Sequence, residues 1–298
     1  MAGVDATVVA TPSGTGARRF PWIAFLIFPI VIFLAVFFLI PYANMVYMSF
    51  LVKPETGAYI KQFTLGNYAR ALRDPFYWKV LKDTFWYALL TTGITLVLGY
   101  PLAYHIARVP KRWRGWLLVL LISPLLVSII VRSFGWMILL GKVGIINTLV
   151  RRYGGPELHL MYNAVGVVIG LVHVYLPFMA LSIAGALQTI SPDIERAARS
   201  LGASPWHAFW RITWRLSLPG VFAGTLLVFV LAISSYVIPI LLGANNVLVM
   251  PMVIVQMLLD AFNWPLGSAL SMILFGFTVA LLWFYVKLMN RALRWSIR

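Results

Sequence analysis

The chain has 298 residues, of which 61% are apolar and only 11% are charged. This composition is typical of an integral membrane protein and excludes a water-soluble fold. The formal net charge of +16 comes mainly from basic residues in the connectors between apolar runs, so it indicates membrane topology rather than nucleic-acid binding. The sequence contains no cysteine, which excludes disulfides and thiolate metal sites.

The apolar runs predict six membrane-spanning helices, because a bilayer requires about 20 largely apolar residues per helix. In chain order, the predicted spans cover residues 22–47, 85–107, 116–140, 164–187, 221–242 and 268–287. Residues 1–20 are mostly small and polar, which predicts a disordered tail. We therefore expect an all-α integral membrane protein in which residues 21–298 form one transmembrane domain.

A further apolar segment follows the fifth predicted span. The sequence "GANN" at residues 243–246 interrupts the apolar run and leaves residues 247–259 as a remainder. A remainder of this length is more typical of a re-entrant or interfacial segment than of a seventh crossing. Pro251 and the acidic end at Asp260 favour the same interpretation.

The basic residues predict the orientation of the chain in the membrane. With six spans the two termini share one side, and more of the lysines and arginines fall on that side than on the other. Cytoplasmic loops carry the excess of Lys and Arg in membrane proteins. Both termini are therefore expected in the cytoplasm.

A short charged stretch separates the fourth and fifth predicted spans, at residues 191–215. Ser191 and Pro192 are suited to begin a helix, and Gly202 is suited to end it in a left-handed conformation. A second helical piece is expected after Pro205, running into the fifth span. These signals predict a compact helix-turn-helix on the cytoplasmic side, which suits docking better than catalysis.

This loop resembles the cytoplasmic loop of the membrane subunits of ATP-binding-cassette (ABC) importers. That family's pattern is Glu-Ala-Ala, three residues, Gly, nine residues and Ile. The residues that fall on its spacing are Ala197, Ala198, Gly202 and Ile212. The family's Glu position holds Arg196, with Glu195 one residue earlier, so either Glu195 replaces the family's glutamate or Arg196 reverses the charge pairing.

The resemblance implies that this loop is a coupling helix that seats in a groove of a cytoplasmic ATPase. The coupling residues expected on that basis are Asp193, Glu195, Arg196, Ala197, Ala198, Leu201, Gly202, Ala203, Ser204 and Pro205.

Beyond the loop, the chain is most similar to permeases of the spermidine/putrescine type. The similarity runs from residue 21 to the C-terminus and includes "GYPLAYHIARVP", "LISPLLVSIIVRSFGWMILLGKVGIIN", "VGVVIGLVHVYLPFMAL" and "NWPLGSALSMIL". It implies the type I importer permease fold, and import of a small solute by alternating access, with a polyamine as cargo. Related permeases move opines, amino-acid-like compounds and other small organic solutes, which remain alternatives.

The resemblance also implies partners and a location. They are a second homologous permease subunit, two ATPase subunits that hold ATP and Mg²⁺, and a solute-binding protein of the periplasm. The location is the bacterial inner membrane. No nucleotide site is expected in this chain, because "GWMILLGKV" lacks the glycine spacing of a phosphate-binding loop. No catalytic residue, cofactor or metal site is expected either, and the histidines have no second ligand at usable spacing.

Six residues are candidates for the solute path: Arg132, Trp136, Tyr175, Tyr236, Asp260 and Trp264. A charge such as Arg132 within a span costs about 2.5–3.5 kcal/mol on insertion scales and is a functional candidate by default. It is expected either to face the bundle interior or to snorkel toward backbone carbonyls. The predicted spans contain no acid, so the acidic side of a polyamine path would come from the second permease. An anionic or zwitterionic solute would instead contact Arg132 directly.

Two alternatives belong to other functional classes. A secondary transporter would work without ATP and would show ionisable residues at the membrane midplane or an inverted repeat, which we do not find. A membrane scaffold would bind the ATPase without any response to solute. The pair Gly220 and Gly224 predicts close helix packing, and His173 is expected to be a hydrogen-bonded packing residue.

Overall fold

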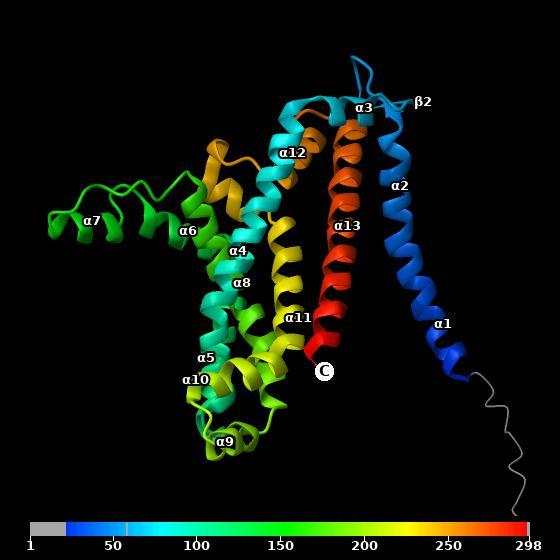
Figure 1. Ribbon diagram of the computed structural model, residues 1–298. Coiled ribbons are helices and arrows are strands. Elements are labelled where there is room, and N and C mark those ends of the chain that lie inside the picture. Colours follow the sequence, from blue (N-terminus) through cyan, green and yellow to red (C-terminus); the bar gives the residue numbers. More distant parts are fainter. Residues whose placement is uncertain (1–21, 58, 297–298) are drawn as a thin grey trace, which may run out of the picture. The chain divides into compact units, whose positions relative to one another are not determined.

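The computed structural model describes residues 22–57 and 59–296, and they are mainly helical, as expected (Figure 1). The predicted tail at residues 1–20 lies outside the described residues. Within the described residues, six helical segments are long and apolar enough to cross a membrane, which confirms the predicted number. Contacts along the chain define two compact units, which meet between Met45 and Val46.

The described part of the first unit, residues 22–45, is one continuous apolar helix. It consists of α1 (Trp22–Leu34), a π-helical turn η1 (Ala35–Leu39) and the start of α2 (Ile40–Ser49). The candidate span Ile27–Ser49 has a mean hydropathy of 2.3. Residues 27–40 are apolar on every side of the helix, and such a helix is stable only when lipid or other protein surrounds it.

The second unit begins with a short connecting region, made of two strands and one helix, that joins α2 to the next long helix. Strands β1 (Leu51–Val52) and β2 (Ile60–Phe63) pair antiparallel, with Leu51 opposite Phe63. Helix α3 (Gly66–Arg73) follows. The amide of Asn67 donates to the carbonyls of Ser49 and Leu51, at 2.9 and 2.8 Å, and so holds α3 against the end of α2 and β1.

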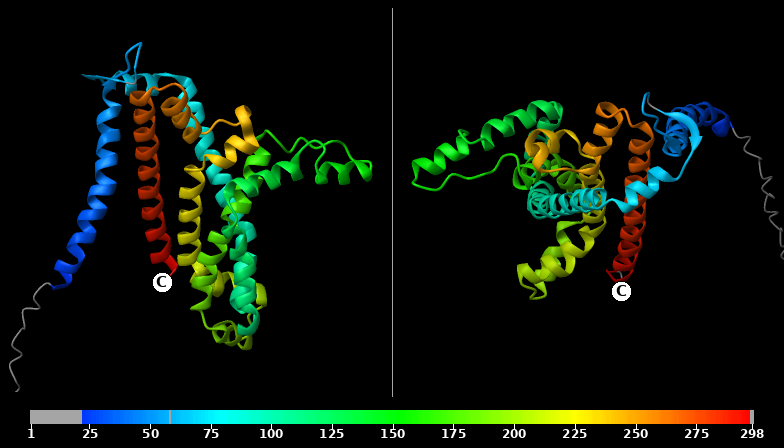
Figure 2. Two further views of the ribbon diagram at one scale, coloured as in Figure 1. Left: turned by 180° about the vertical axis from the view of Figure 1, so that it is seen from behind. Right: turned by 90° about the horizontal axis from the view of Figure 1, so that it is seen from above.

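Three long helices form the packed centre of the second unit: α4 (Pro75–Arg108), α8 (Ala164–Gln188) and α11 (Trp214–Ile233). Both views in Figure 2 show them side by side. Their close approach depends on glycine, because a methyl group at Gly224 would lie 2.8 Å from the sulfur of Met179 on α8. The predicted role of Gly220 and Gly224 in close packing is therefore confirmed.

The predicted span at residues 116–140 is wrong as a single helix. It is divided into α5 (Lys111–Ile122), a 3₁₀ turn η2 (Ser123–Leu126) and α6 (Ile129–Leu140), with α7 (Ile145–Arg152) after it. Pro124 lacks an amide hydrogen and Val127 is extended, so the helix cannot continue through this point. As a result α6 and α7 extend sideways from the three central helices (Figure 2).

The fifth predicted span is also interrupted. Helix α11 ends at Ile233, after which come η4 (Pro239–Gly243), η5 (Ala244–Asn246), α12 (Met250–Val255) and η6 (Gln256–Asp260). The chain bends by 86° between residues 239–246 and 250–260. This bend is consistent with the predicted re-entrant segment.

The last helix, α13 (Trp264–Ser296), packs its first half against α3 and α12. A second, smaller apolar cluster fills this contact and includes Leu266 and Leu270 of α13 and Met250 of α12. Thr84 of α4 joins α12 to the centre, because its hydroxyl accepts the amide of Met250 at 2.8 Å.

Candidate functional site: the coupling loop and the Arg132 group

The coupling loop begins with α9 (Pro192–Ser200), which starts and ends as the sequence predicts. The hydroxyl of Ser191 caps it by accepting the amide of Asp193 at 3.2 Å. Gly202 follows with φ +89°, a conformation that side chains disfavour. Its amide donates to the carbonyl of Arg199 at 3.0 Å, which closes the helix end.

A second short helix, α10 (Pro205–Ala208), follows directly. Ser204 caps it by accepting the amide of His207 at 3.2 Å. A π-helical turn, η3 (Phe209–Thr213), then joins α10 to α11 without a break. Figure 1 shows α9 and α10 beneath the central helices, at the end where α4 finishes. The predicted helix-turn-helix is therefore present.

Glu195 points from α9 into the protein rather than out of it. Its carboxylate accepts hydrogen bonds from Arg108 at the end of α4, from the hydroxyl of Thr213 in η3 at 2.6 Å, and from that of Tyr104 at 3.3 Å. Only 20% of its side chain is exposed. Arg108 additionally donates to the carbonyl of Ile190 at 3.1 Å. Glu195 is consequently held by groups of its own chain.

Arg196 points outward instead. It pairs with Asp193 at 2.6 Å, and both side chains are more than two-thirds exposed. Leu201 is 90% exposed and Trp206 is 70% exposed. The other expected coupling residues divide by exposure: Ala197, Gly202, Ser204 and Pro205 are exposed, and Ala198 and Ala203 are half-buried. The outer face of the loop thus combines exposed apolar groups with the ion pair of Arg196 and Asp193.

A shallow depression of about 680 Å³ lies between α9 and the α10–η3 segment. Its lining consists mostly of small or apolar side chains, with two basic ones: Ala198, Leu201, Gly202, Ala203, Ser204, His207, Ala208, Arg211 and Ile212. Several of the expected coupling residues therefore share one concave surface.

Three of the six candidate path residues gather around α6. Trp136 donates its indole N–H to His173 Nδ1 of α8 at 3.1 Å, so His173 is a hydrogen-bonded packing residue as expected. Tyr175 is 7% exposed and donates to the carbonyl of Leu231 in the last turn of α11 at 3.0 Å. Arg132 lies within electrostatic range of both Tyr175 and His173.

The guanidinium of Arg132 is incompletely paired. Its Nε and one terminal nitrogen are buried and have no hydrogen-bond partner among the described residues. The buried hydroxyl of Ser235, at the break after α11, lies close to that of Tyr175. Tyr236, another candidate, is the next residue and is half-buried. A buried donor without an acceptor is costly, so the Arg132 guanidinium is suited to bind a hydrogen-bond acceptor from outside the chain.

The structure places the other two candidates elsewhere. Asp260 is exposed at the end of η6, and Trp264 begins α13 with its ring 6.3 Å from that of Tyr59. Lys53 donates to the carbonyl of Ala261 at 2.7 Å in the same region. Among the described residues no hydrogen bond or ion pair joins this region to Arg132. The six candidates therefore form two separate sets. Arg132, Trp136, Tyr175 and Tyr236 make up what we call the Arg132 group, and Asp260 lies with Trp264.

The helix that contains the second predicted span starts ten residues earlier than predicted, and this extension includes one acidic residue. Helix α4 begins at Pro75, because Asp74 caps it by accepting the amide of Phe76 at 2.9 Å. The candidate span Pro75–Arg108 therefore includes Asp83, which a predicted start at residue 85 had left outside. Asp83 is half-buried, and across residues 22–57 and 59–296 it has no ion-pair partner. The aspartate cap followed by proline is the sequence signal that could have found it.

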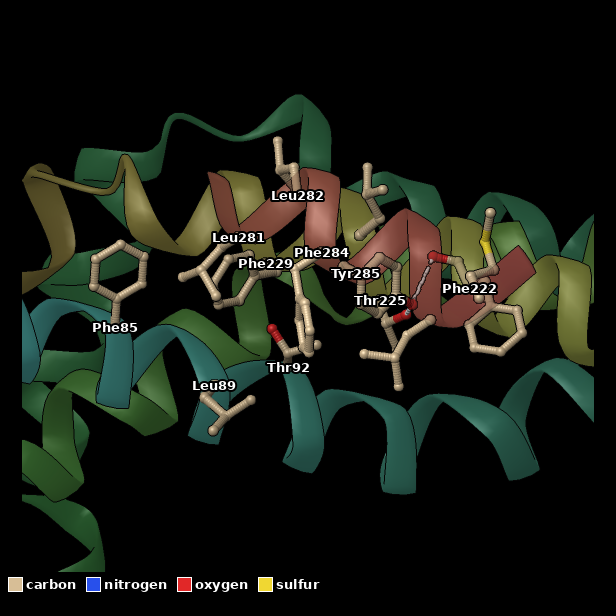
Figure 3. Close-up of a pocket in the computed structure, with 13 residues that line it drawn as sticks. Phe85, Leu89, Thr92, Phe222, Thr225, Phe229, Leu281, Leu282, Phe284 and Tyr285 are labelled. Atoms are coloured by element: carbon tan, nitrogen blue, oxygen red, sulfur yellow. Dashed lines mark hydrogen bonds between the residues drawn. The ribbon is translucent and has the colours of Figure 1, made fainter. Parts of the chain in front are cut away.

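An apolar groove of about 450 Å³ lies between α4, α11 and α13 (Figure 3). Phe85 and Leu89 of α4 face Phe229 of α11 and Leu281 of α13 across it. None of the groove's lining side chains is charged. A lining of this kind suits hydrocarbon or another helix and gives no site for a charged solute.

A family model described as "Binding-protein-dependent transport system inner membrane component" matches residues 95–298, more than half of the chain. The chain belongs to this family. It is therefore an inner-membrane, multi-pass permease of the ABC importer class, and subunits of this class are non-catalytic transport components. Such permeases work with a solute-binding protein, as the family's description states.

Curated relatives are similar along most of their length. The permease is 35% identical over 272 residues to the spermidine/putrescine transport system permease protein PotB of Escherichia coli strain K12, covering 89% of this chain and 98% of PotB. It is 33% identical over 260 residues to PotB of Haemophilus influenzae, covering 86% and 91% of the two chains.

Solved structures support the type I importer permease fold. A bacterial ABC transporter involved in the import of the acidic polysaccharide alginate matches with a TM-score of 0.73 and 17% identity, covering 91% of this chain and 96% of that one. The complex of the bacterial alginate transporter with its alginate-bound periplasmic protein matches with a TM-score of 0.71 and 16% identity, covering 91% and 95%.

Proposed function

We propose that this permease imports a polyamine, spermidine or putrescine, as one membrane subunit of an ATP-driven transporter. The observation that carries the proposal is the 33–35% identity with PotB over most of both chains. Both relatives bear the name of a spermidine/putrescine system.

The proposed mechanism is alternating access. A periplasmic binding protein delivers the solute to this permease and a second, homologous permease subunit. Two ATPase subunits hold ATP and Mg²⁺, close on ATP, and move the coupling helices from the cytoplasm, where both termini of this chain lie. That motion rocks the two permeases between inward-open and outward-open states, and ATP is hydrolysed only in the partner subunits.

Asp83 supports a cationic cargo. A protonated amine crossing a membrane protein requires carboxylates or aromatic faces along its path. Asp83 is half-buried within α4, its charge acts on the hydroxyl of Tyr87 one turn later, and both side chains are partly accessible. We assign Asp83 and Tyr87 to the amine path from this chain, with further acidic groups supplied by the second permease.

Arg132 favours a second candidate, an amino compound that also carries a carboxylate. Two nitrogens of its guanidinium are buried without acceptors, and a carboxylate would supply a charged acceptor to this edge of the protein's solute path. A polyamine has no such group and would be repelled. The Arg132 group and Asp83 therefore make opposite predictions about the cargo.

The test is the ATPase activity of the reconstituted transporter with its binding protein, measured with spermidine, putrescine and a panel of amino acids. For a polyamine we expect stimulation by spermidine or putrescine, and a rise of about tenfold in the half-maximal concentration for Asp83→Asn, equivalent to about 1.4 kcal/mol. Glu157→Gln is the control, because Glu157 pairs only loosely with exposed Lys142, at 3.7 Å.

Each other outcome contradicts part of the proposal. Stimulation by an amino acid that is lost in Arg132→Gln would select the second candidate. Absence of any co-purifying ATPase would overturn the importer mechanism and favour transport without ATP. Docking of the ATPase with no response to any solute would favour a scaffold.

A further inference from the structure

Helix α9 has little apolar contact to hold it in place. None of its nine residues, all of which the structure describes, is buried. A helix this short is marginal on its own in water. Polar contacts therefore contribute to its position relative to the central helices, and the carboxylate of Glu195 makes those that reach α4 and η3.

The Glu195 contacts reach two of the three central helices. Arg108 is the last residue of α4, and Thr213 lies in η3, which continues directly into α11. The same Arg108 donates to the carbonyl of Ile190, in the connector between α8 and α9. We call these three residues, Glu195, Arg108 and Thr213, the Glu195 node. It joins α9 to α4 and α11 at one point.

The node is better placed than a surface ion pair to transmit force. The Glu195 and Arg108 side chains are only 20% and 17% exposed, so water competes weakly for their charges. Hydrogen bonds between charged groups are shorter and stronger than neutral ones. Tyr104 adds support from α4, because its ring lies 5.7 Å from the Arg108 guanidinium and its hydroxyl donates to Glu195.

We propose that Glu195 is a positioning residue inside the permease, which transmits movement of α9 to α4 and α11 and does not contact the ATPase. The charge that faces the ATPase at the family's glutamate position is then Arg196, which lies on the outer face of α9 with Asp193. This inference rests on the proposed coupling to an ATPase, and it separates two roles: Arg196 acts in assembly, and Glu195 acts in transmission.

The test compares assembly with coupling in the reconstituted transporter. For Glu195→Ala we expect the ATPase to co-purify at the wild-type ratio while solute stimulation falls by about tenfold or more, because three hydrogen bonds to one charge are lost. Glu195→Gln retains an acceptor for Thr213 and should lose less stimulation. Arg196→Glu, on the outer face, should reduce co-purification instead.

A reversible cross-link distinguishes transmission from a purely structural role. The chain has no cysteine, so Arg108→Cys combined with Glu195→Cys creates the only pair of thiols in this subunit. A bis-methanethiosulfonate linker then joins α4 to α9, and a reductant releases it. We expect the unlinked double variant to assemble but respond poorly to solute, the linked one to regain stimulation, and reduction to abolish it again.

The opposite results would overturn the inference. Glu195→Ala could lower ATPase co-purification as strongly as Arg196→Glu, which would make Glu195 a docking residue. It could leave solute stimulation intact, or the cross-link could fail to restore stimulation, and either result would remove the transmission role. A wild-type transporter without any ATPase would instead contradict the proposed function, so the two failures are distinguishable.

Discussion

Gly220 of α11 packs closely against α8, and we expect Gly220→Ala to force the two helices apart. A methyl group there would lie 2.4 Å from Cβ of Ala186 and 2.9 Å from the carbonyl oxygen of Ser182. Both separations are well inside normal van der Waals contact, so the helices must move apart or the side chains must shift. Overpacking of this kind costs about 1–3 kcal/mol.

Gly185→Ala is the matched control, because Gly185 lies on α8 and a methyl group there would meet no atom within 4 Å. Both substitutions gain about 0.8–1 kcal/mol of helix propensity. The difference in unfolding free energy between the two variants therefore isolates overpacking, and we expect Gly220→Ala to be less stable than Gly185→Ala by about 1–3 kcal/mol.

Denaturation of the purified permease in mixed micelles, followed by circular dichroism, measures this difference. Ala186→Gly should restore part of the stability of Gly220→Ala, because it removes the nearest atom but leaves the carbonyl of Ser182 in place. Equal stability of Gly220→Ala and Gly185→Ala would refute the assigned packing of α8 on α11.

Two further predictions concern single contacts. Thr84→Val should destabilise the permease by about 1–3 kcal/mol in the same denaturation assay, because it removes the hydrogen-bond acceptor that the structure gives the buried amide of Met250. Thr92→Val is the control and should cost less, because the hydrogen bond of its hydroxyl stays within α4. Equal losses in the two variants would contradict this role of Thr84. Gly202→Val should lower co-purification of the ATPase, because φ +89° is strongly unfavourable for a β-branched residue. Gly202→Asn should retain co-purification, since asparagine tolerates positive φ. Unchanged assembly in the valine variant would argue against docking through this loop.

Local signals in the sequence were sufficient to predict much of the coupling loop. The serine caps at Ser191 and Ser204 and the glycine stop at Gly202 act within four residues of themselves, so their effect is independent of the rest of the fold. The spans were predicted from length and apolar content alone, which works because a bilayer has a fixed thickness. Their boundaries were less accurate, and Asp83 was missed for that reason.

Long-range packing decided what the loop's charges do. The sequence left open whether Glu195 or Arg196 takes the family's glutamate role. Adjacent helical residues point about 100° apart, so only one of them can face α4. Arg108 lies 87 positions earlier in the chain, and its place at the end of α4 draws Glu195 inward and leaves Arg196 outside.

For the Arg132 group, too, the sequence identifies the residue and the packing of the helices decides its surroundings. Apolar composition and one embedded arginine identified a candidate in the sequence, but not its neighbours. The break at Pro124 and the bend after Ile233 bring α6, α8 and the end of α11 together, and thereby place Arg132 near Tyr175. The sequence by itself determined the membrane class, the number of spans and the helix-turn-helix between the fourth and fifth of them. Tertiary structure alone decided which charges are paired within the chain, because partners separated by tens of residues meet only when the helices pack.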